Sequence, residues 1–188
     1  MNRLAVLQIP GATWRRLIAD VSAVVLLLAV GIVGFAATFD GPSYIVASAG
    51  ALVLGLALAW VGARWRWGIL SLAGATVALY FLLGGALALP RTTFLGVVPT
   101  LETWRQLAIG VVTSWKDLLT TVPPVDAGDG HLIVPFLTTL VAAVITASLA
   151  FRLRRAAWAL IPASLYIAGE ILMGTAQTVA PVVQGALF

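Results

Sequence analysis

The sequence predicts an all-α, polytopic membrane protein: five transmembrane helices, the start of a sixth, and one amphipathic helix on the outer face. Composition indicates this class, because the 188 residues are 61% hydrophobic and only 10% charged, whereas a soluble domain is nearer half apolar and a quarter charged. The apolar residues also gather in long runs. Polar side chains are too few to cover such a surface, so lipid must be the solvent of this chain.

Five runs reach the length of about 20 mostly apolar residues that a spanning helix needs. The first is too long for the apolar region of a signal peptide, and no cleavage signal followed by a soluble domain comes after it, so we expect it to be retained. The five predicted spans cover residues 17–37, 44–63, 68–89, 132–151 and 157 to about 176.

Basic residues predict the orientation. If the five runs alternate, most arginines fall on one side, and cytoplasmic loops carry such an excess. The N-terminus is therefore predicted to be inside. The excess of arginine over lysine and the dominance of Ala, Val and Leu suggest a GC-rich bacterial genome, so we expect the membrane to be a bacterial plasma (inner) membrane. The topology-setting residues on the inner side are Arg15, Arg16, Arg64, Arg66, Arg152, Arg154 and Arg155, together with Arg3; Arg91, Arg105 and Lys116 fall outside.

Both ends of the chain lie outside the five runs. Residues 1–16 are predicted to be a cytoplasmic segment, either lying on anionic lipid or frayed. Residues 177–188 resemble the start of a sixth span that stops after about two turns. We expect the chain to be a fragment of a longer protein; the alternative is a re-entrant or interfacial tail.

The connection 90–131 is the longest, and its residues 100–119 carry apolar side chains at helical spacing on one face. Thr100 is the expected N-cap, and the prolines at 123 and 124 end the helix. Two interpretations stay open for its apolar face: an interfacial helix in lipid, or a docking surface for an extracytoplasmic domain or partner. The candidate docking or interfacial residues are Trp104, Leu107, Val111, Trp115 and Leu118.

Composition also limits the chemistry. The chain has no cysteine and one histidine, His131, which removes thiolate nucleophiles and clustered Cys or His metal sites. Asp126 and Asp129 lack the spacing of a calcium loop. No catalytic, cofactor or metal residue is predicted. The net charge of +4 reflects arginines at the ends of apolar runs, so nucleic acid is not an expected partner.

Few residues inside the spans are ionisable, and each is a functional hypothesis by default. Glu170 lies about 22 Å along a helix from Arg155, in the outer third, and is a candidate intramembrane polar contact. Small residues at four-residue spacing predict packing faces. These are Ala51, Gly55 and Ala59 in the second span, Ala143 and Ala147 in the fourth, and Ser164 and Ala168 in the fifth.

Several phrases resemble the N-terminal membrane domain of bacterial TgpA-type transglutaminase-like proteins, and the resemblance extends over nearly the whole chain. They are Trp115-Lys116-Asp117-Leu118-Leu119, Val122-Pro123-Pro124, Gly128-Asp129-Gly130, Val134-Pro135-Phe136, and Phe151-Arg152-Leu153-Arg154-Arg155 before Trp158-Ala159-Leu160-Ile161-Pro162. In that family a sixth helix and an extracytoplasmic domain with a papain-like Cys-His-Asp triad follow. Without a cysteine, no triad position carries over to this chain.

The resemblance implies a non-catalytic membrane anchor or platform for such a domain, with the lipid bilayer and that domain or other membrane subunits as partners. The alternative is a subunit of a membrane transporter or membrane complex. It would bind through its two helical hairpins, which are the first with the second span and the fourth with the fifth span, or through its outer amphipathic helix. A transporter should show polar residues converging at mid-membrane depth, and the spans carry mainly Ser, Thr and Gly there.

Overall fold

The computed structural model describes residues 14–94, 96, 98–120, 125, 130–152 and 156–173. Over these residues the regular structure is helical, as predicted, with two isolated β-bridges. The α-helices are α1 (Trp14–Gly34), α2 (Ser43–Arg64), α3 (Ile69–Ala88), α4 (Leu101–Thr120), α5 (Ile133–Arg152) and α6 (Leu160–Met173). Short 3-10 turns are η1 (Phe35–Ala37), η2 (Pro90–Thr92) and η3 (Ala156–Ala159).

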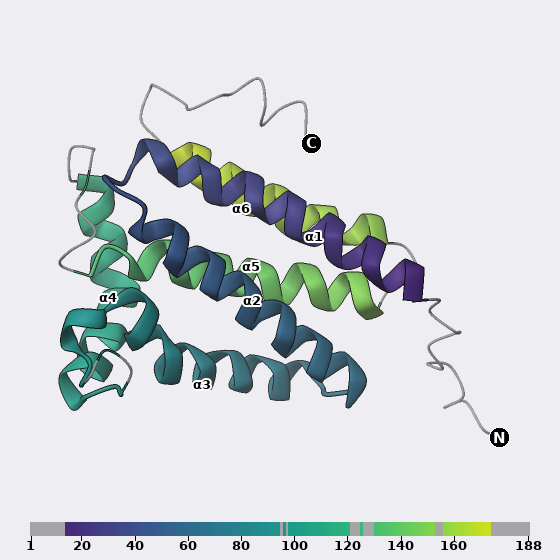
Figure 1. Cartoon of the computed structure of the whole chain (residues 1–188), viewed down its shortest axis with the longest axis horizontal. Helices are drawn as coiled ribbons and strands as arrows, with labels where there is room; N and C mark the ends of the chain where they lie inside the picture. The colour runs from purple at the N-terminus through teal and green to yellow at the C-terminus, as the bar shows by residue number, and fades with distance from the viewer. Residues whose placement is uncertain are drawn as a thin grey trace.

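Five helices form a bundle, and α4 runs across one end of it (Figure 1). In chain order α1, α2, α3, α5 and α6 pass back and forth between the two ends. We call one of them the arginine end, because α2 and α5 finish there with Arg64 and Arg152. The opposite one is the α4 end. The predicted outer helix is therefore a real element, displaced by one residue from the predicted range.

Among the described residues, three helices are long and apolar enough to cross a membrane, judged by length and composition: α2, α3 and α5. Their 20 to 22 residues extend about 30 Å, the thickness of a bilayer core. Over the residues whose side chains are described, the apolar parts of α1 and α6 are shorter, Ile18–Gly34 and Leu160–Ile171. The predicted N-terminal segment up to residue 13 and the predicted sixth span lie outside the described residues.

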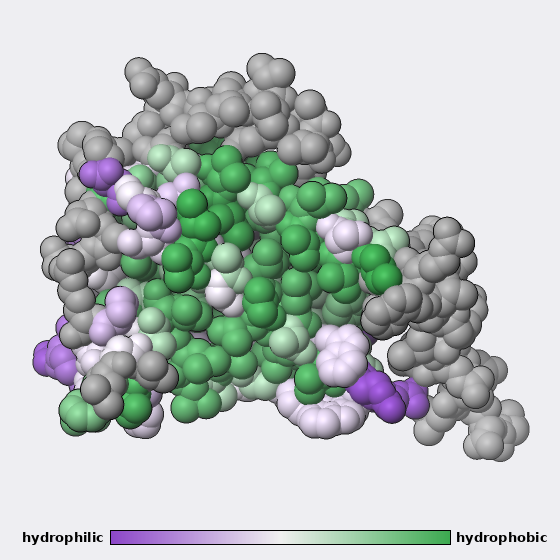
Figure 2. Space-filling model, in the orientation of Figure 1, coloured by the Kyte–Doolittle hydropathy of each residue, from purple (hydrophilic) through white to green (hydrophobic). Residues whose placement is uncertain are grey.

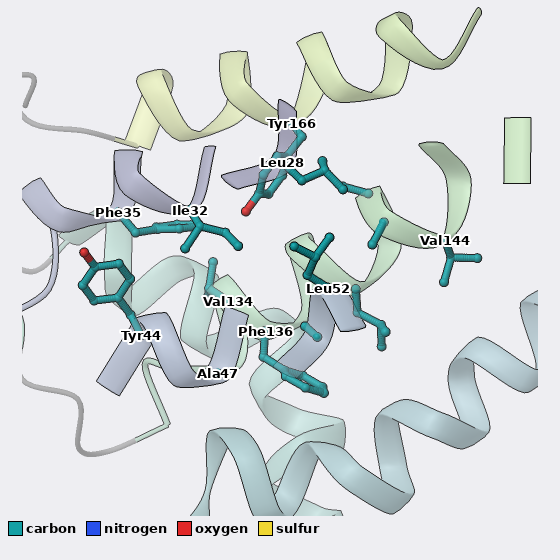
Figure 3. Close-up of a cluster of buried hydrophobic side chains, with 14 of the residues drawn as sticks. Leu28, Ile32, Phe35, Tyr44, Ala47, Leu52, Val134, Phe136, Val144 and Tyr166 are labelled. Carbon is teal, nitrogen blue, oxygen red and sulfur yellow. The ribbon is translucent and has the colours of Figure 1, made fainter. Parts of the chain in front are cut away.

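The core is built around α2 and α5, the pair in most extensive contact. A Cβ added to Gly55 would lie 2.6 Å from the Cβ of Ala143, so only a glycine permits this approach. Ala51, Ala59 and Ala147 are fully buried on the same faces, which confirms the small-residue packing predicted for these two helices. Larger side chains from α1, α2, α5 and α6 fill the space beside them (Figure 3).

The small-residue face predicted on the last helix is wrong. Ala168 is exposed, and the Ser164 hydroxyl bonds within its own helix to the Leu160 carbonyl. The buried face of α6 carries Ala163, Tyr166, Ile167 and Glu170 instead. The close approach on this side comes from α1, because a Cβ on Gly31 would collide with the Tyr166 ring and lie 2.9 Å from a Glu170 carboxylate oxygen.

The surface between the two ends of the bundle is apolar. Figure 2 shows a continuous hydrophobic area over the middle of one face, with hydrophilic residues gathered at the two ends. The described tryptophans also lie at the ends: Trp60, Trp65, Trp67 and Trp158 at the arginine end, and Trp104 and Trp115 in α4. An apolar band between two aromatic belts is typical of a protein embedded in a bilayer.

Candidate functional site

The candidate site is α4 together with the part of the bundle on which it packs, which we call its seat. Two glycines near the end of α3 allow the close contact: a Cβ on Gly85 would lie 2.6 Å from the Thr103 methyl carbon, and one on Gly84 would lie 3.3 Å from a Leu107 methyl. The buried Tyr80 hydroxyl of α3 donates a 2.9 Å hydrogen bond to the Leu107 carbonyl in the middle of α4. This pairing of α3 with α4 fixes the helix across the bundle end.

A cluster of threonines holds the start of α4. The Thr100 hydroxyl accepts a hydrogen bond from the Thr103 amide (3.2 Å), and the Thr103 hydroxyl accepts one from the Thr100 amide (3.1 Å). This reciprocal arrangement is a capping box, and it confirms Thr100 as the N-cap. Both hydroxyls also donate to the Thr92 carbonyl, at 2.9 and 2.8 Å. The cap is thus tied to the turn that leaves α3.

α4 has three faces rather than two. One face is buried on the bundle: Thr103, Leu107, Gly110, Ser114 and Leu118. A second face is apolar but exposed: Leu101, Trp104, Ala108, Val111, Val112 and Trp115. The third face is mostly polar and exposed: Glu102, Arg105, Gln106, Ile109, Thr113, Lys116 and Asp117, with Gln106 partly covered.

The predicted docking residues therefore divide between two faces. Trp104, Val111 and Trp115 keep 41–47% of their surface exposed and remain available to lipid or a partner. Leu107 is fully buried and Leu118 is 5% exposed, so their assignment to an outward docking surface is corrected. Both are core residues of the seat, because the buried and the exposed apolar faces adjoin on the helix and give one wide stripe in the sequence.

An open groove of about 550 Å³ lies between α4 and α3, beside the place where the two helices are in contact. Its lining is Phe81 from α3 and Leu101, Trp104, Arg105 and Ala108 from α4. Arg105 supplies the only charge among the described residues of this lining. Its guanidinium lies 3.9 Å from Glu102, in a pair that is largely exposed to solvent. Such exposed pairs contribute little to stability, which leaves the Arg105 charge available to a ligand.

The loops at the α4 end contact one another. Val125, which follows α4, pairs with the turn between α1 and α2: its amide donates to the Thr38 carbonyl (2.8 Å), and its carbonyl accepts from the Asp40 amide (3.0 Å). Asp126 and Asp129 lie outside the described residues. His131 begins the approach to α5, and its Nδ1 is buried without a hydrogen-bond partner in the described part of the chain. The pairing of Val125 with Thr38 and Asp40 ties the segment after α4 to the turn between α1 and α2.

Glu170 is buried between α1 and α6, toward the α4 end, with 5% of its surface exposed. Neither carboxylate oxygen meets hydrogen-bond geometry with a described residue. One turn earlier on α6, the Tyr166 hydroxyl forms a 2.6 Å hydrogen bond with Thr139 of α5. Glu170 therefore lies where α1 and α6 meet, and no cation in the described structure neutralises it. Its role as an intramembrane polar contact stays a prediction.

The topology-setting arginines do not share one environment. The Arg152 guanidinium donates to the Trp67 carbonyl (2.8 Å) and to the Gly62 carbonyl (3.1 Å), near the end of α2. A cation is favourable at this position because the C-terminal carbonyls of a helix carry partial negative charge. Arg64 and Arg66 are exposed. Arg15 and Arg16 start α1 at the same end, whereas Arg154 and Arg155 lie outside the described residues.

No group of three or more His, Cys, Asp or Glu side chains in the described structure is placed to hold a metal ion. Comparison with known proteins identified no matching family model, curated protein or solved structure.

Proposed function

We propose that this chain is a non-catalytic platform domain of a bacterial plasma membrane protein. In this proposal all five bundle helices cross the bilayer, with the arginine end in the cytoplasm. α4 then lies in the outer interface, with its exposed apolar face toward lipid and its polar face toward the extracytoplasmic space. A domain resembling the transglutaminase-like proteins would rest on that polar face.

The proposal rests on the three faces of α4. A helix that served only to fill the bundle end would need one apolar face, and α4 has a second, of which Leu101 is 83% and Val112 is 74% exposed. In water this face would be costly, at roughly 25 cal/mol for each Å² of apolar surface. In the outer interface it lies in lipid, while Trp104 and Trp115 lie at headgroup depth.

The arginine end supports the orientation. Arg64, Arg66 and Arg152 lie together there, with the starts of α1 and α6, and an excess of basic residues is typical of the cytoplasmic side. α1, with 21 residues, is long enough for a full crossing, and the bundle contacts place both α1 and α6 alongside α5.

The alternative is a subunit of a membrane transporter or complex. Buried Glu170 favours it, because an intramembrane carboxylate is usually functional or paired. The close contact of Gly55 with Ala143 between the two hairpins weighs against a substrate cleft at that position. Assembly with further helices beside α1 and α6 remains the stronger form of this alternative.

Site-specific photocrosslinking distinguishes the two functions. A benzophenone amino acid is introduced at Gln106 or Thr113 on the polar face, and at exposed Ser71 of α3 as the control, in the chromosomal gene of the source bacterium. The platform predicts adducts from Gln106 and Thr113 to a transglutaminase-like domain, within the same polypeptide or in another, and none from Ser71. Adducts from the polar face to a transport component would contradict the platform and support the alternative.

A further inference from the structure

The groove between α3 and α4 leads from the bundle end into the apolar layer. Phe81 precedes the last residue of α3, Ala88, by seven residues, or about 10 Å along the helix axis. The other lining residues belong to α4, at the end of the bundle. The groove thus joins the depth of the membrane interface to the depth of acyl chains, a direction suited to a lipid rather than to a water-soluble ligand.

The chemistry of the lining changes along the same path. Phe81, Leu101 and Ala108 offer apolar contact, and Trp104 lies beside them with 47% of its surface exposed. Arg105 stands at the border between the exposed apolar face and the polar face of α4. A guanidinium binds phosphate oxygens through two parallel hydrogen bonds. An apolar groove with one arginine among its lining residues matches an acyl chain joined to a phosphate group.

We propose that this groove binds one phospholipid with an anionic headgroup, from the leaflet at the α4 end. One acyl chain lies between Phe81 and Trp104, and the phosphate lies at Arg105. The inference rests on the membrane placement in the proposed function, but not on the platform role. A bound lipid would cover the apolar side of α4 next to α3 and hold the helix at a fixed depth.

Quenching of tryptophan by brominated lipid tests the site. The full chain is reconstituted in vesicles of neutral lipid that contain increasing fractions of dibrominated phosphatidylglycerol or dibrominated phosphatidylcholine. The Trp104 signal is the difference between the parent protein and Trp104→Phe. We expect half-maximal quenching of this signal at about fivefold less phosphatidylglycerol than phosphatidylcholine, the preference expected from one basic residue near an anionic surface.

Two variants of α4 separate a site from general attraction to the surface. Arg105→Gln should abolish the headgroup preference, whereas Lys116→Gln removes another exposed cation of the same helix, outside the groove, and should leave the preference intact. Ala108→Phe should fill the groove and weaken quenching by both lipids. Equal loss of preference in the arginine and lysine variants would overturn the lipid site.

The remaining outcomes are distinct for the two proposals. If both lipids quench Trp104 equally in the parent protein, the anionic lipid site fails and the membrane placement stands. The Trp158 signal is the difference between the parent protein and Trp158→Phe. If Trp158 is quenched and Trp104 is not, protein covers the groove, and the lipid site also fails. If neither is quenched by any brominated lipid, the membrane placement in the proposed function fails with it.

Discussion

Thr103 is the residue on which the seat of α4 most depends. It is fully buried, and its hydroxyl lies within 2.8–3.1 Å of the Thr92 carbonyl, the Thr92 hydroxyl and the Thr100 amide and hydroxyl. Thr103→Val keeps the shape and removes the hydroxyl, which leaves the Thr100 amide without its partner. A buried polar group left unpaired costs about 1–3 kcal/mol. Local detachment of α4 should therefore become about 5- to 150-fold more frequent.

The absence of cysteine gives a direct assay. Ser114 is 5% exposed on the buried face of α4, so Ser114→Cys reports detachment through its rate of maleimide labelling. Thr103→Val should accelerate this labelling by the factor above. Thr103→Ser keeps the hydroxyl and loses only the methyl that faces Gly85, and should change the rate by a few-fold. If valine and serine at position 103 give the same rate, the hydroxyl does not hold the helix and the reasoning is refuted.

Three further substitutions are tested by thermal unfolding of the purified protein in detergent. Glu170→Gln should change stability by less than about 1 kcal/mol, since no described cation pairs with the carboxylate; a loss of about 3–5 kcal/mol would instead reveal a buried ion pair. Gly55→Ala should destabilise the protein by about 1–3 kcal/mol through overpacking. Gly74→Ala is the control, because open space surrounds Gly74, and it should not destabilise the protein. Equal effects of the two substitutions would contradict the tight α2–α5 contact. Arg152→Gln should lower the free energy of unfolding by about 1.5–3 kcal/mol, the contribution of hydrogen bonds from a charged group, whereas exposed Arg64→Gln should leave it almost unchanged. A larger loss for Arg64→Gln than for Arg152→Gln would contradict the capping role of Arg152.

The sequence was sufficient to predict the helices, because long apolar runs and one amphipathic stripe are local signals. It was insufficient to predict how α4 is seated. The buried face of that helix includes Thr103, Gly110 and Ser114, and small or polar residues do not register as buried in a hydropathy pattern. The exposed apolar face next to it merged with Leu107 and Leu118 into one apparent stripe.

Contacts between distant residues explain the other differences. Gly84 and Gly85 lie inside an apolar run and give no local signal of a contact, whereas they are the place where α4 meets α3. Arg152 counted as a topology signal, and its bonds to the carbonyls of Gly62 and Trp67 join residues 85 to 90 positions apart. The tryptophans at both bundle ends were a signal present in the sequence. Read together with the arginines, they could have predicted both interfaces of the membrane.

Accessibility of single cysteines in intact cells shows which end of the bundle faces the outside of the membrane. Asp40→Cys and Lys116→Cys are exposed positions at the α4 end, and Trp65→Cys is an exposed position at the arginine end. We expect a membrane-impermeant maleimide to modify positions 40 and 116 in spheroplasts, and position 65 only after the membrane is permeabilised. Modification of position 65 in sealed spheroplasts, or protection of positions 40 and 116 until permeabilisation, would contradict the proposed placement of the chain in the membrane.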